Sequence, residues 1–334
     1  MDELRARITP TPTSDVRVAF RGRDHDVLLK FEQFNSTGSV KDRTAAGLLI
    51  AMNWQSPITP DTVVVESTSG NLGLALAHLV GLIGCRLIAV IDPKTPEYTR
   101  RNLARPGVEV RLVEEPDGHG GYLLTRLRTV AELCRGNPDY RWSDQYGNHA
   151  SPWIHRRTTG PEIVRQGGPD LDAVYVAVST GGTLAGVSAH LRGVRSGARI
   201  VAVDSAGSLA FGCTSGPRLL TGIGSSRPST FLGPDTFDQG CHVPDAEAIA
   251  MCRIFRADTG IAVGGSSGCV LAACVRDLAS PLPPRRPLCL CPDSGDKYAD
   301  TVYNDDWLRD RGADQDVARA TEQLRADGLE FRNG

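Results

Sequence analysis

Short apolar runs that predict strands alternate with helical patterns along most of this chain of 334 residues. The strand-like runs are TVVVES (62–67), RLIAVI (86–91), VEVRLV (108–113), AVYVAV (173–178), RIVAV (199–203) and PLCLC (287–291). The patterns typical of helices cover about 71–84, 95–104, 121–134 and 183–194. Strands that alternate with helices of this length form βαβ units, so the sequence predicts an α/β fold with mostly parallel sheets. Because the runs are almost continuously apolar, helices are expected to cover both faces of each sheet.

The composition predicts a soluble protein of two domains in the cytoplasm. Hydrophobic residues make up 40% of the chain and the net charge is -2, so no charge excess favours nucleic acid or a membrane. No apolar run approaches the ~20 residues of a membrane-spanning helix. The charged N-terminus, MDELRARITP, lacks the apolar stretch of a signal peptide. The nine cysteines are scattered without the spacing of zinc ligands, which favours reduced thiols and no metal site.

A lysine stands at the start of one predicted helix. The stretch FNSTGSVKDRTAAG (34–47) leads from a polar, glycine-bearing turn into that helix, with Lys41 just inside it. The positive end of a helix disfavours a cation there, and only four of the chain's 37 basic residues are lysine. Lys41 is therefore either an ordinary surface residue or an amine whose pKa the nearby positive end lowers. A neutral amine would be nucleophilic.

Three glycine-rich turns join predicted elements where α/β proteins bind ligands. ESTSGNLG (66–73) and VSTGGTLAG (178–186) each follow a strand and open a helix, so their amides point from the carboxyl edge of a sheet. The second loop lacks the lysine of a Walker loop and the spacing of a dinucleotide fold, but its amides and hydroxyls suit one phosphate. VGGSSGCV (263–270) opens a further helix. Each turn is also consistent with a structural role, in which Ser or Thr caps the helix.

A phosphate loop together with an unusual lysine suggests pyridoxal phosphate (PLP), whose aldehyde forms a Schiff base with lysine. Six motifs then follow a familiar order: NSTGSVKDR, ESTSGNLG, IHRRTTGPEI, STGGT, GIGSS and GGSSG. In this order the chain resembles the cysteine synthase and cystathionine β-synthase family, the fold type II PLP enzymes, from about residue 8 to about residue 308. Agreement among six motifs is far more specific than any one of them.

The resemblance implies a role for each motif. Lys41 would form the Schiff base and carry a proton, with Ser39 as helix cap and Asp42 at capping-box spacing. Asn71 would bond the cofactor's 3′-oxygen, and Ser266 would face the pyridine nitrogen. The phosphate would bind Ser179, Thr180, Gly181, Gly182 and Thr183. The substrate carboxylate would bind Thr68, Ser69, Gly70, Asn71 and Gln145. A hydroxyl at the ring nitrogen favours β-replacement through an α-aminoacrylate.

Within the family, ESTSGNLG, GIGSSRP (222–228) and PDSGDKYADTVYNDDWL (292–308) resemble the synthases of the 2,3-diaminopropionate pathway. That likeness implies O-phospho-L-serine and L-glutamate as substrates and N-(2-amino-2-carboxyethyl)-L-glutamate as product. Ser225, Ser226 and Arg227 would form an anion-binding set for the phosphate leaving group, unless Arg227 is a solvated loop residue. A cysteine or cystathionine synthase using sulfide or homocysteine is the alternative, and a non-catalytic binding homologue is a remote one.

The resemblance also implies a division of the chain and a homodimer. Residues 1–35 and 150–312 would form the larger, PLP-binding domain. Residues 36–149 would form a smaller, mobile domain that carries Lys41 and the asparagine loop. Residues 313–334 are expected to be a charged C-terminal tail.

Overall fold

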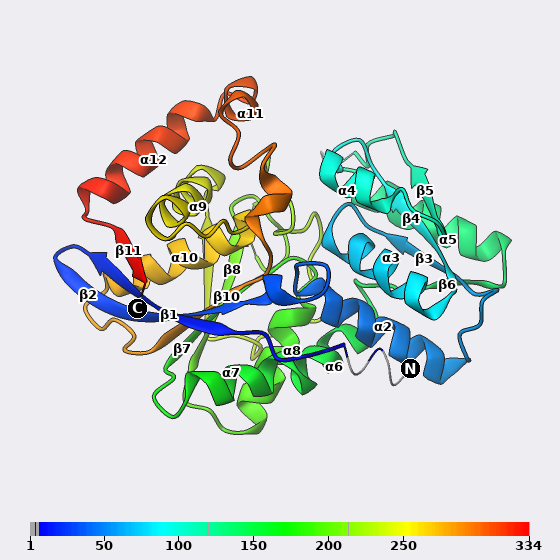
Figure 1. The fold of residues 1–334 in the computed structure, drawn as a ribbon, viewed down its shortest axis with the longest axis horizontal. Helices are drawn as coiled ribbons and strands as arrows, with labels where there is room; N and C mark the ends of the chain where they lie inside the picture. Colours follow the sequence, from blue (N-terminus) through cyan, green and yellow to red (C-terminus); the bar gives the residue numbers. More distant parts are fainter. Residues whose placement is uncertain (1–3, 5–6, 119–120, 213, 334) are drawn as a thin grey trace.

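The computed structural model describes residues 4, 7–118, 121–212 and 214–333. In this part of the chain the strands form a seven-stranded sheet and a four-stranded sheet, which lie side by side (Figure 1). Most neighbouring strands are parallel and helices pack on the sheets, so the predicted α/β class is confirmed. None of the helices described combines the length and apolar character that crossing a membrane requires.

The larger sheet has the strand order β11-β1-β2-β10-β7-β8-β9. Its strands are β1 (Thr13–Phe20), β2 (Arg23–Phe31), β7 (Ala173–Ala177), β8 (Arg199–Ser205), β9 (Gln239–Val243), β10 (Pro287–Cys291) and β11 (Glu330–Asn333). The strands from β2 to β9 are parallel, whereas β1 pairs antiparallel with β2 and β11. Arg21 and Gly22 join β1 to β2 with φ angles of 49° and 73°, as a type I′ hairpin turn requires.

Helices cover both faces of the larger sheet. One face packs against α7 (Thr159–Gly167) and α8 (Gly182–Gly193), and the other against α9 (Asp245–Thr259), α10 (Gly265–Leu278) and α12 (Asp314–Ala326). Successive residues of β7 point to opposite faces, so Val174 and Val176 join the first core while Tyr175 joins the second. The short α11 (Asp305–Asp310) precedes α12.

The smaller sheet is entirely parallel, with the strand order β5-β4-β3-β6. Its strands are β3 (Val63–Ser67), β4 (Arg86–Ile91), β5 (Val108–Leu112) and β6 (Tyr140–Trp142). Its helices are α2 (Lys41–Gln55), α3 (Asn71–Ile83), α4 (Glu97–Leu103) and α5 (Leu123–Gly136). Coverage is incomplete at the edge strand β5 of this sheet, where Val110 and Leu112 are 39% and 46% exposed.

The charged C-terminal segment is part of the larger sheet rather than a separate tail. Strand β11 pairs with β1, and the Phe331 ring packs edge-on against Phe255 with 5.1 Å between ring centroids. The Arg325 guanidinium lies 2.6 Å from the Asp258 carboxylate of α9. Apolar contact and pairing along a sheet edge therefore hold a segment whose composition alone predicts a solvated tail.

Helix α6 (Ala150–Arg157) connects the parts of the chain that carry the two sheets. It packs against α8 of the larger part and against α2 of the smaller one. A Cβ atom on Gly47 of α2 would lie 2.7 Å from Cβ of Ile154 in α6, so the close approach of these helices requires glycine. The division into a large domain and a mobile small domain, 36–149, stays a prediction.

Candidate active site

A cavity opens where the carboxyl ends of strands from both sheets meet, the edge at which α/β proteins bind ligands. Residues 68–71 follow β3, residues 179–183 follow β7, and residues 292–298 follow β10. The predicted residues that line the cavity are Lys41, Thr68, Ser69, Gly70, Asn71, Gln145, Ser179, Thr180, Gly181, Thr183 and Ser266. Those of the predicted set that do not line it are Gly182, Ser225, Ser226 and Arg227.

Lys41 is the first residue of α2, but the cap of this helix differs from the predicted one. Val40 takes the cap position and makes no side-chain cap bond. The Ser39 hydroxyl accepts from the Lys41 amide at 3.3 Å, too early for the predicted capping-box bond to residue 42. The Asp42 carboxylate instead accepts from the Thr37 amide at 3.1 Å and hydroxyl at 2.8 Å. Hydrogen bonds to the Ser39 hydroxyl and to the Asp42 carboxylate therefore stabilise the turn just before Lys41.

Burial lowers the pKa of Lys41 to about 8, while the nearby Asp293 carboxylate acts to raise it. About one tenth of Lys41 is therefore a neutral amine at pH 7, far more than for a lysine of ordinary pKa. The direction of the shift agrees with the expectation from sequence. Its main cause is burial beside the cavity rather than the positive end of the helix.

The asparagine loop, 68–71, is held in shape by its own hydrogen bonds. The Thr68 hydroxyl accepts from the Gly73 amide at 2.8 Å, and a Cβ atom on Gly73 would lie 2.7 Å from Thr68 Cγ2. The Gln145 side chain donates to the Ser67 carbonyl at 2.9 Å, which fixes this amide beside the loop. The loop then opens α3 at Asn71, so amides at a helix start face the cavity and suit a carboxylate.

A buried carboxylate, Glu66, supports the asparagine loop from behind. It accepts from the Ser143 hydroxyl at 2.5 Å, the Gln145 amide at 3.2 Å and the Ser67 amide at 2.9 Å. Burial raises its pKa from 4.5 to about 7 despite these three donors. The folded protein therefore binds a proton here more tightly than the unfolded chain does.

We expect Glu66 to make the protein less stable as the pH rises. The folded pKa lies above the unfolded one, so the stabilising contribution of the neutral form is complete below about pH 4.5 and is lost as the pH rises through about 7. A shift of this size corresponds to about 3 kcal/mol. The free energy of unfolding of wild type should fall by this amount relative to Glu66→Gln between about pH 5 and pH 8. Parallel pH profiles for the two proteins would contradict the prediction.

The predicted phosphate loop joins β7 to α8. Gly181 has φ of +90° and occupies the cap position of α8, where a side chain would be strained. A Cβ atom on Gly182 would lie 2.1 Å from the Ser151 hydroxyl, so Gly182 allows the loop to sit on α6 even though it does not line the cavity. The amides at the start of α8 are thereby free of side-chain obstruction and can hold a phosphate.

His155 lies behind this loop as a neutral, fully buried group. Its Nε2 lies 2.9 Å from the Thr44 hydroxyl and 3.3 Å from the Thr183 hydroxyl, and its Nδ1 lies 2.9 Å from the Thr159 hydroxyl. Burial lowers its pKa to about 3, and Lys41 and Arg43 lower it further. His155 thus connects α2 with the phosphate loop structurally and is not placed to act as a base.

Ser266 lies one residue inside α10 and is 2% exposed. Gly264, at the cap position of α10, allows the start of this helix to approach Asp293 closely, because a Cβ atom on Gly264 would lie 2.0 Å from Asp293 Oδ1. The short helix η2 (Gly295–Tyr298) follows, and Lys297 and Tyr298 line the cavity together with Asp293. Sequence reasoning assigned no role to these three, although residues after the carboxyl end of a predicted strand are site candidates.

The three residues predicted to bind the leaving group lie outside the cavity wall. The Arg227 guanidinium lies 5.0 Å from the centroid of the Tyr146 ring, and it is Tyr146 that lines the cavity. The Ser226 hydroxyl accepts from Arg218 at 3.1 Å, and the Ser225 amide donates to the Ser208 hydroxyl at 2.9 Å. Their placement disagrees with direct contact to a phosphate in the cavity.

Arg126 of α5 is a cation that does line the cavity, and none of the predicted motifs includes it. It is 7% exposed and lies 3.1 Å from the Asp92 carboxylate. Its position in the helical pattern could have identified it, because Arg126 lies on the same helix face as three buried apolar residues, Leu123, Leu127 and Val130. A charged residue on the apolar face of a helix is a candidate for a buried polar role.

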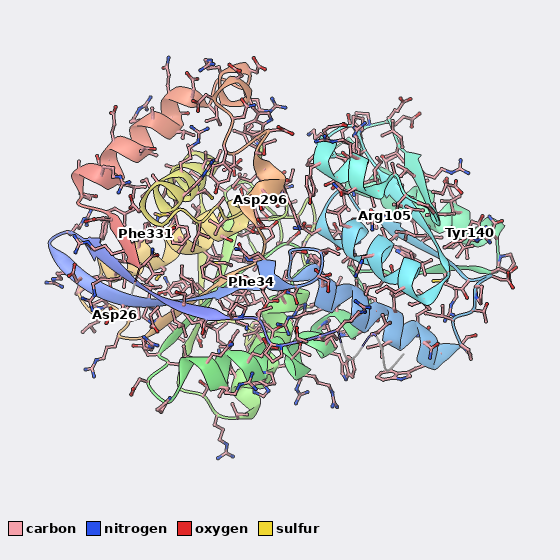
Figure 2. All side chains as sticks on the ribbon, viewed as in Figure 1. Asp26, Phe34, Arg105, Tyr140, Asp296 and Phe331 are labelled. Atoms are coloured by element: carbon pink, nitrogen blue, oxygen red, sulfur yellow. The ribbon has the colours of Figure 1, made fainter. Side chains whose placement is uncertain are left out.

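A second cavity of about 520 Å³ lies on the other side of Lys297. Its lining includes Phe34, at the end of η1 (Glu32–Phe34), and Asp296, with Arg105 across from them (Figure 2). Lys297 lines both cavities, so its contacts form part of the wall that separates them.

The residues of the first cavity, which Lys41 lines, fit pyridoxal phosphate. It contains an amine of lowered pKa, a glycine-lined helix start for a phosphate, an asparagine amide and a buried hydroxyl. Among the described residues, no group of three His, Cys, Asp or Glu side chains is arranged to hold a metal ion.

Comparison with known proteins identifies the same class. Residues 4–293 match the family described as "Pyridoxal-phosphate dependent enzyme". The chain therefore belongs to this family of PLP-dependent enzymes, and pyridoxal phosphate is confirmed as its cofactor.

Three individual proteins are similar to this chain over most of its length. N-(2-amino-2-carboxyethyl)-L-glutamate synthase of Ralstonia nicotianae is 39% identical, over 89% of this chain and 88% of its own. The protein of that name from Cupriavidus metallidurans is 40% identical, with the same coverage of both chains. The crystal structure of cysteine synthase from Entamoeba histolytica has a TM-score of 0.82 and 25% identity, and covers 96% of this chain and 95% of its own. The resemblance to these synthases is confirmed.

Proposed function

We propose that this enzyme replaces the phosphate of O-phospho-L-serine with the amine of L-glutamate, giving N-(2-amino-2-carboxyethyl)-L-glutamate and inorganic phosphate. The observation that carries the choice of donor is Arg126, a buried cation in the cavity wall. A guanidinium suits a phosphate leaving group, whereas acetate esters carry no charge for it to bind. The names of the two relatives support the choice of nucleophile.

Pyridoxal phosphate, when bound, supplies an aldehyde for the substrate amine and a ring that withdraws electrons from the substrate Cα. In this proposal Lys41 holds the cofactor and then moves the proton at Cα, a task for which an amine of pKa about 8 is suited. The start of α8 holds the cofactor phosphate, and Ser266 faces the ring nitrogen. The asparagine loop and Gln145 orient the substrate carboxylate.

The proposal includes a smaller domain, 36–149, that closes over the substrate and excludes water. It also includes a homodimer in the cytoplasm, on the basis of family resemblance, and the molar mass in solution tests the oligomeric state.

Product identification tests the proposed reaction. The purified enzyme is offered O-phospho-L-serine or O-acetyl-L-serine together with L-glutamate, sulfide, homocysteine or ammonia, and the products are identified by mass spectrometry. The proposal requires the glutamate adduct of phosphoserine to dominate. Cysteine as the main product would instead favour the alternative of a cysteine synthase, to which the fold is also similar.

Arg126 should determine the choice of donor. We expect Arg126→Met to lower kcat/KM for O-phosphoserine by about tenfold to a hundredfold, the loss typical of one charge-assisted hydrogen bond. The value for O-acetylserine should change little, and the ratio of the two donors cancels any general effect of unpairing Asp92. Arg227→Met is the matched control and should leave the ratio near that of wild type. A selective loss in Arg227→Met alone would restore the loop 225–227 as the phosphate site.

A further inference from the structure

Lys297, which the proposed function leaves unused, lies beside the cavity between the two parts of the chain. It belongs to η2, whose start is capped by the Ser294 hydroxyl, which accepts from the Asp296 amide at 3.2 Å. The Lys297 ammonium donates to Asn71 Oδ1 at 2.7 Å and to the Gly38 carbonyl at 3.1 Å. One cation thereby connects the turn before Lys41 with the start of α3.

The Asn71 amide is engaged at both ends. Its Nδ2 donates to Asp293 Oδ2 at 2.7 Å, and the Tyr298 hydroxyl donates to the same oxygen at 2.5 Å. An ammonium can only donate and a carboxylate can only accept, so the two partners together determine which end of the amide is oxygen and which is nitrogen. Asn71 and Tyr298 both line the cavity, so the Asn71 amide is within reach of a ligand there.

The two partners of the amide depend on each other. Asp293 is 1% exposed, and burial raises its pKa while Lys297 is the strongest of the charges that lower it. Without Lys297, the neutral form of Asp293 would be favoured. A neutral carboxyl group both donates and accepts, so it would no longer determine the orientation of the amide. Lys297 thus acts on Asn71 directly and through Asp293.

We propose that Lys297 is a positioning residue that holds the Asn71 amide with one N–H directed at the cofactor's 3′-oxygen. The inference rests on the role proposed above for Asn71. The Lys297 ammonium would be separated from that oxygen only by the Asn71 amide, so it would also favour the anionic form of the oxygen. Both the affinity for the cofactor and the visible spectrum of the bound cofactor should therefore depend on Lys297.

The test measures the dissociation constant of pyridoxal phosphate and the absorbance maximum of the bound cofactor in purified variants. Lys297→Met removes the ammonium and keeps the length of the side chain. We expect it to weaken cofactor binding by about tenfold to a hundredfold and to move the absorbance maximum. Lys297→Arg keeps a cationic donor and should stay closer to wild type. Should Lys297→Met fail to fold, Lys297→Gln repeats the test with a neutral polar side chain.

Ser294→Ala is the matched control, because it disturbs the cap of the same turn without touching Asn71. It should bind cofactor as wild type does. Wild-type affinity and spectrum in Lys297→Met would overturn the inference, and so would an equal loss in Ser294→Ala, which would reduce Lys297 to a support of η2. Unchanged cofactor binding in Asn71→Ala would instead contradict the role proposed for Asn71 itself.

Discussion

Lys41→Ala is expected to abolish turnover, and the visible absorbance of the bound cofactor should change to that of non-covalently held pyridoxal phosphate. Loss of a positioned acid–base group alone costs about a hundredfold to ten-thousandfold, and this variant loses the covalent attachment as well. The second lysine of the cavity, Lys297, is an unsuitable substitute, because Asn71 and Gly38 already bind its ammonium.

Borohydride reduction followed by peptide mapping identifies the attached lysine independently of activity. The cofactor should be recovered on the peptide that contains Lys41. Lys30→Met is unsuitable as a control because Lys30 belongs to a buried ion cluster, so Lys94→Met serves instead and should be reduced at Lys41 as in wild type. Recovery of the label at any other lysine would refute the assignment of Lys41 and with it the proposed site.

The elements around the site could be predicted because their sequences are unambiguous. Strands β3, β4, β7, β8 and β10 are buried on both faces, so each contains an apolar run, and β3, β4 and β7 are each followed by a turn and a helical pattern. The predicted motifs follow β3 and β7 directly, and parallel strands bring such turns to one edge. Contiguous motifs therefore predict which loops line the cavity.

The missed strands carry weaker signals. Strands β1 and β2 contain many polar residues, because β1 lies near the edge and both extend beyond the core at the hairpin. Their Arg21–Gly22 turn lacks the Asn-Gly or Asp-Gly pair that usually identifies a hairpin. The edge strands β9 and β11 are short and largely exposed, so their sequences resemble loops.

The missed site residues depend on tertiary packing rather than on motifs. Whether Arg126 lines a cavity is decided by how α5 packs on the smaller sheet, and Arg227 lies behind Tyr146 because of the path of its loop. The contact of Lys297 with Asn71 joins residues 226 positions apart in sequence. A single sequence carries no signal that pairs such distant residues.

A buried cluster of four charges holds the helix that begins at Lys41. Its members are Lys30, Glu32, Arg43 and Glu162, of which three are 0% exposed and Glu162 is 5% exposed. Arg43 lies 2.7 Å from Glu32 and 2.6 Å from Glu162, and Lys30 lies 2.7 Å from Glu162. Two positive and two negative charges balance, so the cluster joins β2, η1, α2 and α7 without a net buried charge.

Glu162→Gln is therefore expected to destabilise the fold by about 3–5 kcal/mol, because it leaves one buried positive charge uncompensated. The measurement is the free energy of unfolding in denaturant. Glu97→Gln is the matched control: Glu97 pairs with Arg101 on the surface at 3.7 Å, and such an exposed pair contributes about 0.3–0.5 kcal/mol. The double variant Lys30→Met with Glu162→Gln restores neutrality, and it should be more stable than Glu162→Gln alone. If the two substitutions were instead additive, lost contacts rather than an unbalanced charge would explain the destabilisation.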